Sequence, residues 1–201
     1  RTGSGSAISN GFALVGAQAA DIGTGDTGAV FVFDLTTGAE VRTLAPTPAV
    51  SNTFLGCSVA AYGNLVIGGA QLDDTAATNA GAAYIFDFTD GTQLHCLTAS
   101  NAEEQANLGI SVDICASYAM AGAYKATPFG NYSGAAYLYD ANTGEELFAF
   151  VAADGGSYDW YGRSVAVSEQ YAVVGAPCWD GPGYTTCGAV YVYDTVTGDQ
   201  I

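Results

Sequence analysis

The stretch YGRSVAVSEQYAVVGAP, residues 161–177, decides the fold because the chain repeats it. The glycine near its start is Gly162, and its counterparts are Gly3, Gly56 and Gly109, each 53 residues from the next. The Gly-Ala pair near its end recurs at the same interval, and a second phrase of the type GAVYVYD follows every copy. A fixed period of this length indicates a repeat architecture. The 201 residues therefore consist of four copies of one unit.

Each copy contains four segments with the residue pattern of short β-strands. In the second copy, successive side chains of residues 57–62 fall on alternate sides of the chain, with the two-residue period of a strand. A short turn leads to the mostly apolar residues 65–70, and residues 81–87 are rich in the aromatic and branched side chains that strands favour. Asp87 can accept hydrogen bonds from the amides ahead of it in the next turn, and residues 92–97 form the fourth strand. No segment shows apolar residues at helical spacing.

A single sheet of this kind cannot bury both of its faces. Radial stacking of neighbouring sheets buries them, and that arrangement is a β-propeller. The repeated Gly-Ala steps would let adjacent sheets approach closely near the axis. A sandwich of hairpin pairs is the alternative, but sandwiches rarely repeat in sequence. The chain is therefore predicted to be a single all-β propeller segment, with four four-stranded antiparallel repeats at residues 1–53, 54–106, 107–159 and 160–201.

The repeats resemble a known family in the phrases FLGCSVAAY, LVIGGA and GAAYIFD of the second copy and WYGRSVAVS, AVVGAP and GAVYVYD of the fourth. This family is the FG-GAP repeat, the blade of integrin-α-type propellers. Such propellers usually have seven blades, so the resemblance implies that the chain is part of a longer one. Integrin-type blades often carry a calcium loop between the first two strands. That connection is too short here for the six to eight oxygen ligands of Ca²⁺, so the chain resembles the short-hairpin variety without this loop.

The charge balance excludes two classes of partner. The chain has 20 acidic and four basic residues and a formal net charge of −16. Nucleic acids and anionic membranes are bound through Lys and Arg, so neither is expected as a partner. The same charge is expected to keep the surface solvated. No apolar run is long enough to span a membrane, so no direct membrane insertion is expected.

The cysteines and one sequon indicate the compartment. Cys178 and Cys187 stand at the two ends of the loop CWDGPGYTTC, and such ends can come within disulfide distance, so a bridge between them is predicted. The sequence leaves open the pairing of the other three, Cys57, Cys96 and Cys115. The only glycosylation sequon, NYS at Asn131, lies in a loop. Together with the habitat of the family, these features place the protein outside the cell or at the cell surface.

The candidate binding residues lie in the long connections. The loop between the second and third strands and the link between copies are expected to emerge on one face of the disc, and function in repeat scaffolds tends to lie on such loops. Trp179 has no aromatic counterpart in the first two copies, which favours a binding role, whereas Trp160 occupies the column of Phe54 and is assigned to packing between blades. The candidates for binding a glycan or a protein partner are Trp179, Asp180, Tyr184, Tyr158 and Tyr132.

Three functions are compatible with this face. The first is a non-catalytic extracellular interaction module that presents it to protein partners or to neighbouring blades of a larger assembly, because aromatic residues with few lysines are typical of interfaces. The second is a lectin-like propeller in which Trp179 or Tyr184 stacks on a sugar and Asp180 binds its hydroxyls. The third is a carbohydrate-active enzyme. Because the single histidine, His95, falls away from this face and no catalytic set of residues is visible, the non-catalytic module is preferred.

The acidic loops of the first two copies offer a weak option for binding calcium. Aspartates in the first two copies could bind Ca²⁺ together with backbone carbonyls. Flexible acidic loops resemble such sites far more often than they form them, so no cofactor and no metal site are predicted. The carboxylates concerned are Asp21, Asp26, Asp73 and Asp74.

Overall fold

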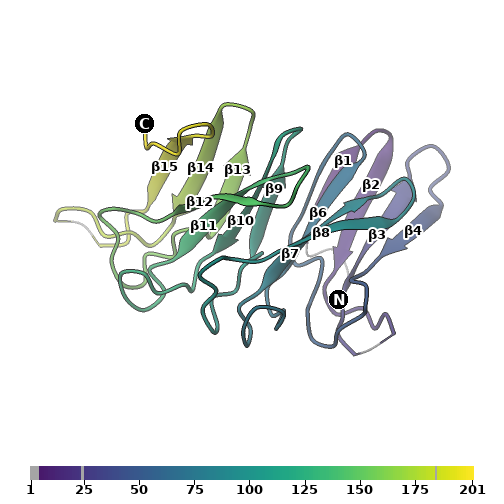
Figure 1. Ribbon diagram of the computed structural model, residues 1–201, viewed down its shortest axis with the longest axis horizontal. Helices are drawn as coiled ribbons and strands as arrows, with labels where there is room; N and C mark the ends of the chain where they lie inside the picture. The colour runs from purple at the N-terminus through teal and green to yellow at the C-terminus, as the bar shows by residue number, and fades with distance from the viewer. Residues whose placement is uncertain (1–4, 24, 184) are drawn as a thin grey trace.

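The fold is all-β, as predicted, and is built from four separate sheets. The computed structural model describes residues 5–23, 25–183 and 185–201. The strands in these residues form four antiparallel meanders, in each of which the strands pair in chain order. The sheets stand side by side along the longest dimension of the molecule (Figure 1). None of the described residues belongs to a helix that is long and apolar enough to cross a membrane.

The strands are four to six residues long. Sheet 1 contains β1 (Ser6–Ser9), β2 (Phe12–Ala17), β3 (Ala29–Asp34) and β4 (Glu40–Leu44). Sheet 2 contains β5 (Val59–Tyr62), β6 (Leu65–Ala70), β7 (Ala82–Asp87) and β8 (Thr92–Leu97). Sheet 3 contains β9 (Ser111–Ile114), β10 (Tyr118–Ala123), β11 (Ala135–Asp140) and β12 (Glu146–Phe150). Sheet 4 contains β13 (Ser164–Val167), β14 (Tyr171–Ala176) and β15 (Ala189–Asp194).

An aspartate shapes the turn after the third strand of each sheet. Asp87 Oδ1 accepts a hydrogen bond from the amide of Thr89 at 2.8 Å, which confirms the role predicted for it. Its counterpart Asp140 accepts from the amides of Asn142 and Thr143 at 2.8 and 3.0 Å. Such a carboxylate satisfies backbone donors that the ladder leaves free, so the repeated aspartate folds the same turn in every copy.

The hydrophobic core lies between the sheets rather than within any one of them. Each of three clusters of buried residues joins two successive sheets. We call the face that a sheet turns toward the next sheet its downstream face, as with Leu14 and Val30 of sheet 1. The opposite face is the upstream face, as with Tyr84 and Phe86 of sheet 2. Aliphatic downstream faces thus pack against aromatic upstream faces, which buries both sides of an inner sheet.

Glycines allow the backbones of neighbouring sheets to meet. A Cβ at Gly69, near the end of β6, would overlap the carbonyl of Gly109 at the entry to sheet 3. No side chain fits such a position without moving the backbone. The Gly-Ala steps therefore have the role predicted for them. The same overlap would occur at two further positions, Gly16 against Gly56 and Gly122 against Gly162.

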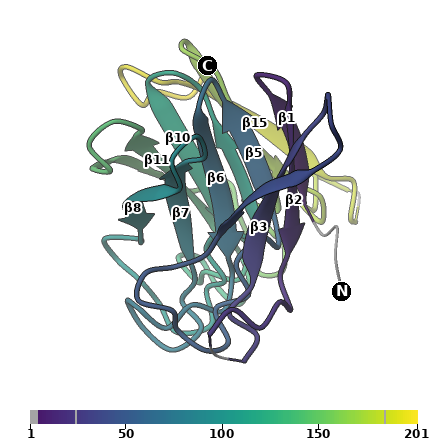
Figure 2. The same cartoon turned by 90° about the vertical axis from the view of Figure 1, so that its right-hand side faces the viewer.

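The long connections gather on one side of the molecule, as predicted. Parallel bridges tie the loop before the third strand of each sheet to the link that enters the next sheet. These bridges are Gly28–Leu55, Gly81–Leu108 and Gly134–Tyr161. We call this side the loop face; it lies at the lower edge of the molecule in both views (Figures 1 and 2). The first strands β1, β5, β9 and β13 border a shared groove of about 470 Å³.

The prediction of a four-stranded fourth repeat is wrong. Sheet 4 has three strands, and beyond them only an isolated bridge joins Tyr193 to Gln200. Gln200 corresponds to Glu146, the first residue of β12, so only the first pair of a fourth strand is formed. The sheets resemble propeller blades, but they do not close a ring within the described residues, because sheets 1 and 4 lie at opposite ends of the row (Figure 1).

Candidate functional site

Aromatic and basic side chains gather on the loop face where sheet 3 meets sheet 4. The rings of Tyr124 and Trp160 meet edge to face with centroids 6.0 Å apart, and those of Tyr132 and Tyr158 do so at 5.7 Å. Lys125 Nζ joins the two pairs, because it lies 5.4 Å from the Tyr124 centroid and 5.9 Å from that of Tyr132. Such distances are typical of cation–π contacts.

Arg163 completes this group from the entry to sheet 4. Its Cζ lies 5.7 Å from the Tyr124 centroid. We call the whole set the aromatic patch. It consists of Tyr124, Lys125, Tyr132, Tyr158, Trp160 and Arg163.

The aromatic patch is accessible and firmly held. The exposed fractions of Tyr132, Tyr158 and Trp160 are 39%, 54% and 36%. Trp160 has the left-handed φ of 59°, and Phe54 and Asn107 at the same repeat position have φ values of 59° and 58°. This strained conformation therefore belongs to the repeat scaffold, and only the side chain distinguishes the fourth copy. Trp160 does pack against the preceding sheet through Tyr124, as its assignment to packing requires, but more than a third of its surface is exposed.

The aromatic patch contains two of the chain's four basic residues. Among the basic residues that the structure describes, Lys125 and Arg163 lie in the patch. The third, Arg42, donates instead to the carbonyl of Thr89. In a chain with a net charge of −16, two cations thus lie beside a group of aromatic rings, three of which are exposed. Sequence reasoning had selected Tyr132 and Tyr158 but missed Lys125 and Arg163, which come from different repeats.

The other predicted binding residues have different surroundings. Trp179 is half-buried and packs against the cluster between sheets 3 and 4, and its indole Nε1 is buried without a hydrogen-bond partner among the described residues. Asp180 is exposed, and its Oδ1 accepts the amide of Thr186. Tyr184 lies outside the described residues. The structure therefore brings Tyr132 and Tyr158 together and gives Trp179 a packing role.

Of the four carboxylates considered for calcium, those of Asp21, Asp73 and Asp74 bind the protein's own backbone and side chains. Asp73 is fully buried and accepts from the Tyr84 hydroxyl and the Thr75 amide, both at 2.7 Å. Burial, together with the bond to Asp73, raises the pKa of the Tyr84 hydroxyl far above its usual value. Two other carboxylates tie loops across five residues, Asp21 to the Asp26 amide and Asp74 to the Asn79 amide. Across the described ranges, no three His, Cys, Asp or Glu side chains gather as a metal site would require.

The predicted Cys178–Cys187 bridge is absent from the structure, in which all five cysteines are free thiols. The Cys178 amide donates to the Asp159 carbonyl of the preceding link, and the amide of Cys187 donates to the Trp179 carbonyl. The backbone therefore places Trp179, rather than Cys178, opposite Cys187. Asn131, the predicted glycosylation site, is exposed on the loop face.

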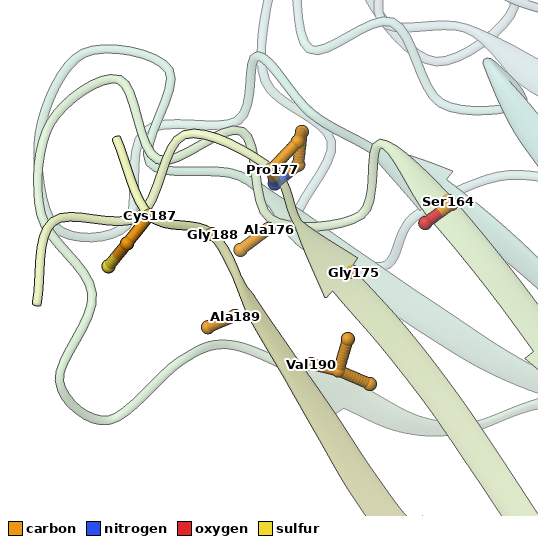
Figure 3. Close-up of a pocket in the computed structure, with 8 residues that line it drawn as sticks. All are labelled: Ser164, Gly175, Ala176, Pro177, Cys187, Gly188, Ala189 and Val190. Atoms are coloured by element: carbon orange, nitrogen blue, oxygen red, sulfur yellow. The ribbon is translucent and has the colours of Figure 1, made fainter. Parts of the chain in front are cut away.

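A second accessible surface is the downstream face of sheet 4. Val190 in β15 is 69% exposed, whereas its counterparts Val30, Ala83 and Ala136 are fully buried by the following sheet. The face borders a hollow of about 480 Å³ (Figure 3). Its lining residues are Ser164, Gly175, Ala176, Pro177, Cys187, Gly188, Ala189 and Val190.

The repeats match a known protein family. The model of the FG-GAP repeat matches residues 39–86, 92–139 and 146–193, which together make up more than half of the chain. Each match begins at or beside the fourth strand of one sheet and ends in the third strand of the next, so the family unit spans a complete junction between two sheets. No curated protein matches the chain. The chain belongs to the FG-GAP repeat family.

Proposed function

We propose that this protein is a non-catalytic interaction module of an extracellular or cell-surface assembly and that it binds a protein partner through the aromatic patch. The proposal rests on one observation: three exposed aromatic rings and two cations lie together in one group on the loop face. Tyr, Trp and Arg are the residues that most often dominate binding energy in protein interfaces. Membership of the FG-GAP family supports an interaction role of the integrin type.

The charge distribution favours a partner that carries a carboxylate in its docking segment. The two cations of the patch attract such a group, whereas the net charge of −16 repels it over the rest of the surface. Electrostatic complementarity of this kind sets the orientation of a partner and suppresses wrong ones. The exposed edges of Tyr132 and Tyr158 then supply apolar contact area beside the charge.

A peptide selection tests the proposal directly. The chain is offered a displayed library of random peptides, and the affinity of the selected peptides is measured for three forms of the protein. Tyr158→Ala is expected to weaken binding at least about 10-fold, since hot-spot truncations commonly cost more than 1.4 kcal/mol. Tyr62→Ala is the matched control, because Tyr62 is 51% exposed and Tyr158 54%. Selected peptides without carboxylates, or peptides that bind the Tyr158→Ala variant equally well, would contradict the proposal.

A glycan-binding role is the second candidate, because the same exposed rings can stack on sugars. A glycan array incubated with the same three proteins separates the two functions. Binding to glycans that Tyr158→Ala abolishes, in the absence of selected peptides, would favour the lectin. Release of sugar from any bound glycan would contradict the non-catalytic role and favour a carbohydrate-active enzyme.

The extracellular setting has its own test. When the chain is expressed through a eukaryotic secretory pathway, the secreted protein is expected to carry one glycan at Asn131, whose side chain is exposed. Asn131→Gln should lower its mass by that glycan. A chain that is retained and degraded in this pathway but folds in the cytosol would contradict the extracellular assignment.

A further inference from the structure

The predicted glycosylation site adjoins the aromatic patch. The backbone carbonyl of Asn131 accepts a hydrogen bond from the Tyr158 amide at 2.7 Å. Two chain segments joined by such a bond run about 5 Å apart. Tyr132 follows Asn131 directly in the chain, and its ring contacts that of Tyr158. The residue predicted to carry a glycan is therefore a neighbour of both tyrosines of the patch.

This placement belongs to the repeat scaffold. The bond between Tyr158 and Asn131 has a counterpart in each earlier junction, where the amide of the link donates to the same loop position at 3.0 and 2.9 Å. These pairs are Asn52 with Gly25 and Gln105 with Thr78. The positions of Tyr132 and Tyr158 are occupied in the first two copies by the polar residues Asp26, Asn79, Asn52 and Gln105. The third copy alone combines a sequon with aromatic neighbours.

The two rings offer a surface that a sugar can cover. Their planes meet at 83°, and both rings are exposed, as is Asn131. The C–H side of a sugar ring packs on the negative face of an aromatic ring and removes apolar surface from water. A sugar bonded to the Asn131 side chain is held close to the rings by a short tether, which gives it a high effective concentration there.

We propose that an N-linked glycan on Asn131 folds back onto Tyr132 and Tyr158 and competes with the protein partner for the aromatic patch, an inference that rests on the function proposed above. The Asn131 amide nitrogen takes the oligosaccharide from a lipid-linked pyrophosphate donor. A bond forms between this nitrogen and C1 of the first sugar, the amide loses a proton, and the bond from C1 to the pyrophosphate oxygen breaks. The glycan then acts as a tethered competitor that lowers the affinity of the patch.

The burial of the sequon serine sets the time of this modification. Ser133 is 3% exposed, and its Oγ accepts the Phe129 amide at 3.1 Å. The hydroxyl that completes the sequon is therefore enclosed in the folded protein, so transfer of the glycan has to precede the folding of this loop. Each secreted chain thus keeps either a free or a covered patch.

Nuclear magnetic resonance tests the contact between glycan and rings without any partner. The chain is secreted from eukaryotic cells, and nuclear Overhauser effects are expected between the first sugar of the Asn131 glycan and the ring protons of Tyr132 or Tyr158. The sugar protons should shift upfield, and Tyr158→Ala should move them back toward the values of a free glycan. A chain without a glycan on Asn131, or a glycan without these ring contacts, would overturn the proposal.

A glycan at the same scaffold position of the first copy is the matched control. Gly25→Asn creates a sequon whose third residue is Thr27, and it is combined with Asn131→Gln. A Cβ at Gly25 would lie 3.9 Å from the nearest atom, Asp21 Oδ1, so the substitution fits the loop. This relocated glycan is expected to show no contact with Tyr132 or Tyr158.

Competition is measured with a peptide selected against the unglycosylated Asn131→Gln chain. The glycosylated wild type should bind it about 10-fold more weakly, because apparent affinity falls with the fraction of molecules whose patch is free, here about one tenth. The relocated glycan should leave the affinity unchanged. Equal affinity of the glycosylated wild type and Asn131→Gln would overturn the competition and leave the proposed function intact. A library that yields no peptide would instead overturn the proposed function, and the ring contacts would still decide whether the glycan covers the patch.

Discussion

A single atom decides how closely two sheets of this protein can approach. At the end of the second strand of sheets 1 to 3, a glycine faces a backbone carbonyl of the next sheet, and a Cβ there would overlap it. The cost of a methyl group at such a site comes from displacing backbone rather than a flexible side chain. Glycine at these positions is therefore a packing requirement as well as a sequence signature.

Replacing Gly122 by alanine is expected to destabilise the protein by about 3 kcal/mol, since overpacking of this kind must shift the Gly162 backbone. Gly156→Ala is the control, because a Cβ there would lie 3.8 Å from the nearest atom, Asp159 Oδ2. It should be neutral or stabilise by about 0.5 kcal/mol through the unfolded chain. Urea unfolding measures both variants, and equal losses of stability would refute this account.

The aromatic patch shows what the sequence could not reveal about single residues. The positions of Tyr132 and Tyr158 in long loops are enough to predict a binding role for them. The sequence predicts only packing between blades for Trp160, because it occupies the repeat position of Phe54. Lys125 and Arg163 become neighbours only because the loop of one sheet lies beside the link into the next. The propeller interpretation already implied this adjacency. Reading each loop together with the following link would have found the two cations.

At the scale of the element, the third turns of sheets 1, 3 and 4 are held by the ionised carboxylates of Asp34, Asp140 and Asp194. The amides of Thr143 and Asn142 hold the pKa of Asp140 below its usual value, and the same arrangement lowers the pKa of Asp34. A carboxyl whose pKa is lower in the folded state stabilises the protein above the unfolded value of about 3.9. That contribution is lost as the pH falls through the folded pKa.

The stability of the wild type should therefore decrease below about pH 4, and Asp140→Asn should make this decrease smaller. The neutral amide still fits the turn but does not titrate. Asp199→Asn is the control, because the described residues donate no hydrogen bond to the Asp199 carboxylate. The midpoint of urea unfolding is measured for each protein in steps of about one pH unit from about pH 3 to about pH 7. If the two substitutions changed the pH profile equally, the turn would not be the cause.

Element boundaries were predictable where every strand had its partners. The second and fourth strands of sheet 2 occupy residues 65–70 and 92–97, as the sequence pattern indicated. The turn after β15 matches the turns that lead into a fourth strand in the other sheets, but it does not by itself form that strand. A strand needs several residues paired along β15, and only the bridge from Tyr193 to Gln200 is present. The bridge Cys178–Cys187 is not formed in the structure, where both residues are free thiols. The ladder between β14 and β15 ends at the pair Ala176–Ala189, and beyond it the Cys187 amide bonds to the Trp179 carbonyl rather than to Cys178.

At the scale of the whole molecule, the net charge of −16 works against compactness. Raising NaCl from about 0.05 M to about 0.5 M should raise the melting temperature, since the Debye length shortens several-fold over this range. An increase of about 2–4 °C per kcal/mol of relieved repulsion is expected for a chain of this size. Chloride rather than sulfate keeps surface-exclusion effects small. A lower melting temperature in high salt would show that attractive ion pairs dominate instead.

The core of this protein lies in its three junctions, and each cluster joins only two successive sheets. Such a molecule behaves as a one-dimensional array, in which the free energy is a sum of unit and nearest-neighbour contributions. Duplication or excision of any 53-residue unit brings together the same two faces, downstream and upstream, that were there before. Unequal recombination between copies can therefore lengthen or shorten the gene without breaking the fold, and the number of units is free to change in evolution while each junction is held constant.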